Sequence, residues 1–118
     1  MSSPTTPRAQ AEQQVAASTA LTVLNLVAYQ EGAVVSRIVL KREKGNVTIF
    51  AFDVAQGLSE HTSPFDALAQ ILDGEAEITI AGQPIPAKAG EVILLPAGQP
   101  HALKAITRFK MLLTMIRS

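Results

Sequence analysis

The sequence of 118 residues contains no cysteine and no tryptophan, and it has only two histidines. Without cysteine, the chain has no disulfide, no thiol nucleophile and no thiolate metal site. Ten basic and ten acidic side chains give a formal net charge of zero. Because phosphate contacts need clustered lysine and arginine, this balance argues against a nucleic-acid partner. The 47% hydrophobic content argues against a wholly disordered chain and predicts one domain with its own core.

Long apolar runs and targeting signals are also missing. No stretch of about 18 apolar residues occurs, so we expect no transmembrane helix and no membrane partner. The N-terminal residues carry a single arginine, Arg8, and no early apolar core, which matches a secretory signal poorly. A cytoplasmic location is therefore expected. Glycine-rich phosphate loops and the G-x-S-x-G nucleophile motif are absent as well, so no nucleotide cofactor is expected.

Residues 1–20 differ in composition from the rest of the chain. They are rich in Ser, Thr, Pro, Ala and Gln, and they have almost no large apolar side chain. We expect a flexible tail; the alternative is a short helix over Ala9–Ala17, because Ala, Gln and Glu favour helices. The folded domain is expected to span residues 21–118. It begins with the apolar segment Leu21–Tyr29, which could form a strand or one or two helical turns.

From residue 33 onward the sequence reads as short strands separated by turn residues. Over residues 75–80, apolar Ala76, Ile78 and Ile80 alternate with polar residues, as is typical of a half-buried strand. Ala81-Gly82 predicts a tight turn, and the two prolines after it predict an edge or irregular strand. The remaining strands are expected at Ala33–Leu40, Val47–Phe52, Ala67–Leu72, Val92–Leu95, Ala102–Ile106 and Phe109–Ile116. This pattern predicts an all-β sandwich or barrel.

A motif near the end of the chain distinguishes these two folds. Gly90, Pro96, Gly98 and His101 have the spacing G-x5-P-x-G-x2-H. Glycine and proline suit turns at the two ends of a strand, with glycine supplying any positive φ. The histidine then begins the next strand and can point into a barrel. The segment resembles the second motif of the cupin superfamily, except that Ala105 stands where the family has Asn.

The first cupin motif, G-x5-H-x-H-x3-E-x6-G, is matched only in part. Its first histidine is His61 and its closing glycine is Gly74. The second histidine position carries Ser63, the glutamate position carries Ala67, and the opening glycine position carries Ala55. The residues that carry the chemistry in this motif are thus mostly replaced.

The resemblance covers about residues 30–116 and is to small, single-domain bacterial cupin-2 proteins with a conserved barrel. It implies an all-β fold, a small jelly-roll β-barrel (the double-stranded β-helix), preceded by the flexible tail. It also implies a homodimer, which agrees with the need to cover apolar edge strands. The cations Lys104 and Arg108 are expected on a solvated face.

The resemblance also implies a site inside the barrel. Cupins that bind metal use three histidines and a glutamate, and this chain keeps two of these four residues, His61 and His101. A first-row metal usually has at least three protein ligands. The third is expected from Asp66, next to the glutamate position, or from Gln70, a polar residue in an apolar run, or from water. The structural alternative for Asp66 is a cap or turn hydrogen bond before the strand, and that for Gln70 is a hydrogen bond across a sheet or subunit interface. The divalent metal would be Fe, Mn, Ni or Zn.

Three functions remain open at this point. The first is a metal-dependent small-molecule enzyme that uses His61 and His101. The second is a metal-free isomerase or epimerase in which His61 acts as the base and Asp66 orients it. The third is a non-catalytic, ligand-binding barrel. In each case a small-molecule ligand is expected to contact residues of the inner wall, namely Ser63, Phe50, Phe52, Ala67 and Leu103.

Overall fold

The computed structural model describes residues 14–118, which form nine strands and one short 3-10 helix. The elements are η1 (Val23–Asn25), β1 (Val34–Arg42), β2 (Gly45–Phe52), β3 (Gly57–His61), β4 (Asp66–Asp73), β5 (Glu75–Ile80), β6 (Gln83–Lys88), β7 (Val92–Leu95), β8 (His101–Ala105) and β9 (Phe109–Ile116). No helix in this part of the chain is long and apolar enough to cross a membrane. The predicted all-β fold is confirmed.

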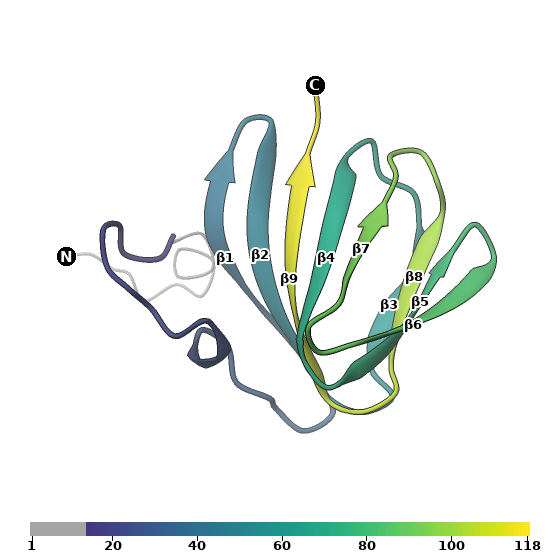
Figure 1. Ribbon diagram of the computed structural model, residues 1–118, viewed down its shortest axis with the longest axis horizontal. Coiled ribbons are helices and arrows are strands. Elements are labelled where there is room, and N and C mark those ends of the chain that lie inside the picture. Colours follow the sequence, from purple (N-terminus) through teal and green to yellow (C-terminus); the bar gives the residue numbers. More distant parts are fainter. Residues whose placement is uncertain (1–13) are drawn as a thin grey trace.

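The strands form two antiparallel sheets, as Figure 1 shows. The five-stranded sheet has the order β1-β2-β9-β4-β7, and the four-stranded sheet has the order β3-β8-β5-β6. Neighbours in the sheets are seldom neighbours in the sequence, as expected of a jelly roll. The structure thus confirms the predicted jelly-roll barrel. As its two prolines predict, β6 is an edge strand.

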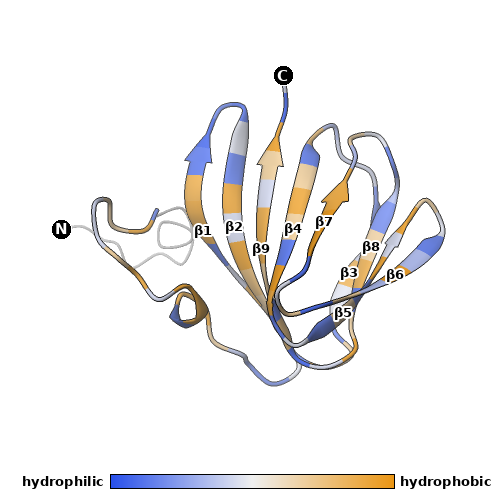
Figure 2. Cartoon of the chain, viewed as in Figure 1, coloured by the Kyte–Doolittle hydropathy of each residue, from blue (hydrophilic) through white to orange (hydrophobic). Residues whose placement is uncertain are grey.

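The core lies between the two sheets and follows from the alternation of the strands. In β4, Ala67, Ala69 and Ile71 are buried while the residues between them are exposed or half-buried. The rings of Phe52 and Phe109 stack with their centroids 4.4 Å apart and an interplanar angle of 3°. Each fully buried side chain of this size contributes roughly 1.5–3 kcal/mol. Apolar residues recur along β2, β9, β4 and β7 (Figure 2).

A second, smaller cluster covers part of the outer face of the five-stranded sheet. Val27 packs there with Ile49 and Ala51 of β2, so both faces of β2 are buried. The Tyr29 hydroxyl donates to a carboxylate oxygen of Asp73 at 2.5 Å, and the Lys110 ammonium donates to the Leu24 carbonyl at 2.6 Å. Burial and the Asp73 hydrogen bond raise the pKa of Tyr29 well above its usual range. Residues 22–29 are therefore held against the barrel by apolar packing and by these two hydrogen bonds.

The N-terminal predictions have mixed outcomes. Of the two forms predicted for residues 21–29, the structure contains a helical turn, η1, and no strand. Residues 14–17, the described part of the alternative helix, are not helical. Instead, the Val15 amide donates to the Val39 carbonyl of β1 at 3.2 Å. Most of the predicted flexible tail, residues 1–13, lies outside the described residues.

Candidate functional site at a histidine pair

The turns before and after β7 have the backbone conformation that the second motif predicts. Gly90 and Gly98 have φ of +93° and +80°, in the left-handed region that favours glycine. The Gly98 amide donates to the Ser63 carbonyl at 2.9 Å, so this turn is tied to the loop between β3 and β4. The two motif histidines border this pair of loops, since His61 ends β3 and His101 begins β8.

Both glycine positions of the first motif have a left-handed backbone, although one of them carries alanine. Gly74, at the closing position, has φ of +77°, and a Cβ atom there would lie 1.8 Å from the Arg108 carbonyl oxygen. Ala55, at the opening glycine position, has φ of +67°. A left-handed conformation is unusual for alanine. Ala55 therefore holds a conformation that glycine would adopt more easily.

The structure brings His61 and His101 into direct contact. The two residues are cross-strand partners in the β3–β8 pair. Their ring centroids are 4.4 Å apart, and the rings meet edge to face at 70°. In β8 the side chains of His101, Leu103 and Ala105 are buried while Lys104 is exposed, so His101 points to the barrel interior. His61 is exposed, and the pair therefore joins the interior to the surface.

Backbone carbonyls fix the orientation of both imidazoles. Nδ1 of His61 lies 2.8 Å from the Ser59 carbonyl oxygen, and Nδ1 of His101 lies 3.3 Å from the Gln99 carbonyl oxygen. Because a carbonyl only accepts, each Nδ1 must carry the proton and donate it. In a neutral imidazole, Nε2 then presents its lone pair. The pair thus offers two Nε2 acceptors.

The electrostatic environment favours the neutral form of His101. Burial lowers the pKa of His101 below its ordinary value, and the neighbouring His61 lowers it further. The hydrogen bond to the Gln99 carbonyl acts in the opposite direction but is the smaller influence. At neutral pH, His101 is therefore an uncharged side chain at the inner end of the site.

Asp66 and Ser63 take part in the loop structure around the pair. A carboxylate oxygen of Asp66 accepts a hydrogen bond from the Ala97 amide at 2.8 Å. The Ser63 hydroxyl oxygen accepts one from the Phe65 amide at 3.1 Å. This hydrogen bond joins Asp66, at the start of β4, to the turn after β7, 31 residues away, so it is not the local cap or turn hydrogen bond that the sequence offered as an alternative.

Gln70 lies on a different surface from the histidines. It is exposed, whereas its neighbours Ala69 and Ile71 are buried, so it faces outward from the five-stranded sheet. The histidines belong to the four-stranded sheet. The structure does not bring Gln70 together with them.

The predicted lining residues mostly belong to the packed core. Phe52, Ala67 and Leu103 are buried members of the main core cluster, and Phe50 is half-buried against it. The ring of Phe52 is held between Phe50, at a centroid distance of 5.7 Å, and Phe109. Phe50 keeps partial exposure, whereas the other three already have protein neighbours on all sides.

The residues around the pair do not fit a resident metal with three protein ligands. Within residues 14–118, no group of three or more His, Asp or Glu side chains is placed to hold a metal ion. Ser63 and Ala67 occupy the remaining ligand positions of the motif. Two imidazoles alone provide fewer ligands than structural or catalytic sites usually have. The site is therefore better suited to a polar small molecule or to a weakly held cation.

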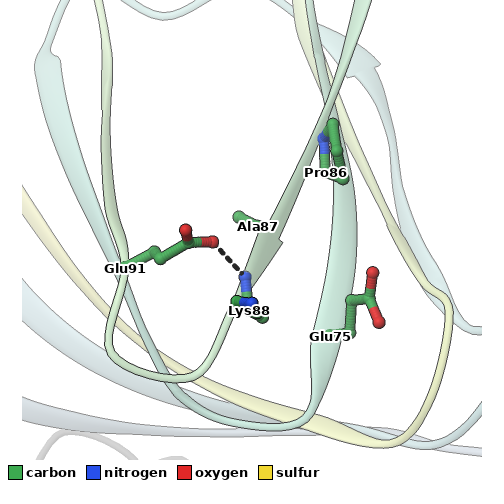
Figure 3. A pocket seen from close by; sticks show the side chains of 5 residues that line it. All are labelled: Glu75, Pro86, Ala87, Lys88 and Glu91. Atoms are coloured by element: carbon green, nitrogen blue, oxygen red, sulfur yellow. Dashed lines mark hydrogen bonds between the residues drawn. The ribbon is translucent and has the colours of Figure 1, made fainter.

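Two open hollows lie along the seam between the edge strands β6 and β7. One, of about 270 Å³, is lined by Glu75, Pro86, Ala87, Lys88 and Glu91. In Figure 3 the Glu91 carboxylate reaches the Lys88 amide, which donates to it at 2.8 Å. The other, of about 460 Å³, runs past Ile85, Val92 and Ile93. Neither histidine lines either hollow.

The sequence did not reveal an ion pair between Asp53 and Arg108, which lies near the C-terminal end of β8, away from His101. Asp53 is buried, and its carboxylate accepts from Arg108 Nε at 2.8 Å and from the amides of Gly32 and Val54 at 2.6 and 2.9 Å. Arg108, followed by these amides, lowers the pKa of Asp53 to about 2. Arg108 was expected on a solvated face; its side chain is half-exposed, and its guanidinium lies over the Tyr29 ring. The solvated position predicted for Arg108 is therefore found, and the sequence did not reveal its ion pair because Asp53 is 55 residues away.

Comparison with known proteins identifies the fold family. The family described as "Cupin domain" matches residues 48–116. A conserved protein of unknown function from Streptococcus pyogenes is 34% identical, with a TM-score of 0.85, over 90% of this chain and 93% of that chain.

Two further solved structures agree with this result. A cupin superfamily protein from Desulfitobacterium hafniense is 28% identical, with a TM-score of 0.83, over 90% of this chain and 97% of that chain. A cupin 2 conserved barrel domain protein from Leptotrichia buccalis is 38% identical, with a TM-score of 0.78, over 80% of this chain and 46% of that chain. No curated protein matches the chain. The family match, which covers more than half of the sequence, shows that this chain belongs to the cupins.

Proposed function

We propose that the chain is a small-molecule-binding cupin whose ligand contacts the His61–His101 pair. The observation that carries this proposal is the fixed orientation of the two rings. Each Nδ1 donates to a backbone carbonyl, so each Nε2 is an unprotonated acceptor when the imidazole is neutral. The ligand chemistry that matches two such acceptors is a pair of O–H or N–H donors, such as neighbouring hydroxyl groups.

The surroundings of the pair add an apolar contact surface. Ile80 of β5 is the register partner of His101 and packs against the core. Leu58 of β3 also packs against it. Binding sites for small molecules commonly combine apolar walls with a few polar groups. A small ligand with a hydroxylated edge and an apolar body therefore suits this end of the barrel.

The geometry supports binding more strongly than acid–base catalysis. A histidine that acts as a base is usually oriented by a carboxylate, which also stabilises the imidazolium that forms. Here both orienting partners are uncharged carbonyls, those of Ser59 and Gln99. Asp66, the orienting carboxylate expected for an isomerase or epimerase, accepts instead from the Ala97 amide. Burial also disfavours the protonated form of His101.

A weakly held divalent cation is the second candidate, because the same ring geometry favours it. Metal-binding histidines commonly donate their second ring N–H to a carbonyl or carboxylate, as His61 and His101 do here. Fe, Mn, Ni or Zn could be held by the two Nε2 atoms only if a bound molecule or water supplied the other ligands. Affinity for the cation alone is therefore expected to be low.

The test uses the fact that the chain has only two histidines. In tag-free, 15N-labelled protein, both imidazoles can be followed by nuclear magnetic resonance during titration with polyols, sugars and hydroxy acids. We expect a binding compound to shift both Nε2 signals. Since one net hydrogen bond is worth about 0.5–1.5 kcal/mol, His101→Gln should weaken binding by roughly 2–10-fold.

Gln70→Ala provides the matched control, because Gln70 is polar but lies on the outer face of the other sheet. It should leave binding unchanged. A compound that binds while both imidazole signals stay unshifted would contradict the proposal, and so would full affinity in His101→Gln. Titration with Zn²⁺ alone separates the two candidates: micromolar affinity that is lost in His61→Gln would favour the cation.

A further inference from the structure

The free edges of the two sheets differ in how their backbone groups are satisfied. β1, one edge of the five-stranded sheet, is covered in part by the N-terminal segment. The Val15 amide donates to the Val39 carbonyl at 3.2 Å, and the Gln14 side-chain oxygen accepts from the Lys41 amide at 2.7 Å. Proteins commonly protect sheet edges, because unpaired backbone groups there pair readily with another strand. β7, the opposite edge of this sheet, has no comparable cover among residues 14–118.

The edge strand β6 of the four-stranded sheet is closed to pairing by its sequence. The Lys88 amide points away from β5, because it donates to the Glu91 carboxylate at 2.8 Å (Figure 3). Alternate residues of a strand turn their backbone groups to the same side, so the free edge also carries Pro84 and Pro86. Neither proline has an N–H group. Each position on this edge of β6 therefore either lacks a donor or has one that is already bonded.

By contrast, β7 presents unpaired backbone groups on its free edge. The Glu91 carbonyl accepts from the Ile71 amide of β4 at 2.9 Å, so the backbone groups of Glu91 and Ile93 turn toward β4. Those of Val92 and Leu94 turn to the free edge, where no acceptor for their amides is found among residues 14–118. Their side chains are 55% and 60% exposed. An apolar edge strand that is open in this way is a place where another strand can be added.

The space beside this edge suits the side chains of such an added strand. The hollow of about 460 Å³ between β6 and β7 is lined mostly by apolar residues, among them Ile85 and Ile93. The adjoining hollow of about 270 Å³ contains the side chains of Glu75, Glu91 and Lys88, so it has one more carboxylate than ammonium group. The first hollow therefore favours apolar side chains, and the second favours a lysine or arginine side chain.

We propose that the free edge of β7 binds a short, extended segment of a partner protein, with apolar side chains at alternate positions and a lysine or arginine at its C-terminal end. The segment runs antiparallel to β7 and exchanges backbone hydrogen bonds with Val92 and Leu94. Its apolar side chain opposite Ile93 enters the larger hollow, and its cation lies opposite Glu91. This surface is separate from the proposed ligand site, since neither histidine lines either hollow, and the inference does not depend on that site.

The first experiment titrates the 15N-labelled full chain with the peptide acetyl-Thr-Val-Thr-Val-Thr-Lys-amide. In the proposed register the valines face the hollow, the third and fifth residues of the peptide pair with β7, and the lysine lies opposite Glu91. We expect the amide signals of Val92 and Leu94 to shift and their hydrogen exchange to slow in the complex. N-methylation of the third and fifth residues of the peptide blocks the pairing edge and should abolish binding. N-methylation of the two valines, whose amides point away from β7, should preserve it.

The second experiment changes the edge itself. Leu94→Pro removes one outward donor, and proline is compatible with an edge strand. Because one net hydrogen bond is worth roughly 2–10-fold in affinity, and the proline ring also obstructs the edge, binding should weaken by about 5-fold or more. Leu94→Ala, which keeps the N–H group, is the matched control and should lose less. Glu91→Gln should weaken binding of the lysine peptide, whereas Glu43→Gln, in the β1–β2 turn, should not.

Three results would overturn the proposal. One is equal affinity for the two N-methylated peptides, a comparison that needs no variant to fold. Another is a Leu94→Pro chain that is folded by circular dichroism and binds the parent peptide as tightly as wild type does. The third is a wild-type chain that leaves the peptide unbound up to about 1 mM. If Leu94→Pro then also lowers the mass measured by sedimentation equilibrium, a second copy of the chain occupies this edge instead of a partner segment.

Discussion

Replacing Gly74 with alanine should destabilise the barrel much more than the same replacement at Gly98, although the two glycines have nearly the same backbone conformation. Their φ angles are +77° and +80°. A Cβ atom in this region costs roughly 1–2 kcal/mol. Alanine also lowers the conformational entropy of the unfolded chain, which stabilises the folded state by about 0.4–1 kcal/mol. At Gly98 a Cβ atom would meet nothing within 4 Å, so the net loss should be about 1 kcal/mol or less.

The surroundings of Gly74 add a steric cost. A Cβ atom there would lie 1.8 Å from the Arg108 carbonyl oxygen and 2.9 Å from the Phe109 Cα atom. Both are backbone atoms, so the β4–β5 turn must separate from the start of β9. Forced displacement of packed atoms costs typically 1–3 kcal/mol, which brings the expected loss to roughly 2–4 kcal/mol.

Urea unfolding followed by circular dichroism would measure both variants. Chains of this size are stable by roughly 6–18 kcal/mol, so Gly74→Ala should still fold, with a clearly lower midpoint. In a thermal melt, Gly98→Ala should shift Tm by about 4 °C or less, and Gly74→Ala by two or more times as much. Equal losses at the two positions would refute the steric reasoning, because only the conformational cost is common to both.

Three further predictions concern pH and backbone conformation. The pKa of buried His101 lies below its ordinary value of 6.5, so on acidification the unfolded chain binds a proton at this side chain before the folded chain does. The free energy of unfolding should therefore fall as the pH drops from above 6.5 through the pKa of the folded protein. Urea titrations at several pH values should show a smaller fall in His101→Gln. Because Arg108 lowers the pKa of Asp53 from 3.8 to about 2, Asp53→Asn should destabilise the chain above about pH 4, and the difference from wild type should disappear as pH falls through 2. Ala55→Gly, at φ of +67°, should stabilise by roughly 0.5–1 kcal/mol in urea unfolding; a loss would contradict the strain assigned there.

The sequence predicted the elements whose pattern is local. The alternation over residues 75–80 identified β5, and the two prolines identified β6 as an edge strand. The strand Gly57–His61 was missed because it has one apolar residue, Leu58, and so shows no alternation. It becomes a strand by pairing with β8, a contact that no local pattern encodes.

In the candidate site, too, the sequence predicted the residues of a motif but not the contacts that depend on the folded backbone. Motif spacing singled out His61 and His101, and the structure places their rings in contact. The carbonyls that orient the rings could not be predicted, since they depend on backbone turns rather than on residue type. The docking of residues 22–29 was missed for a related reason: Tyr29 and Asp73 are 44 residues apart, and neither belongs to a motif.

The position of β9 has a consequence for how the barrel is made. The strand lies between β2 and β4, yet it follows all the other strands along the chain. During synthesis, the edges of β2 and β4 that pair with β9 therefore remain without hydrogen-bonding partners until β9 has left the ribosome. Long-range pairing of this kind folds slowly, and open apolar edges invite association between nascent chains. Expression of this protein should therefore depend more on temperature and chaperone supply than its size alone indicates.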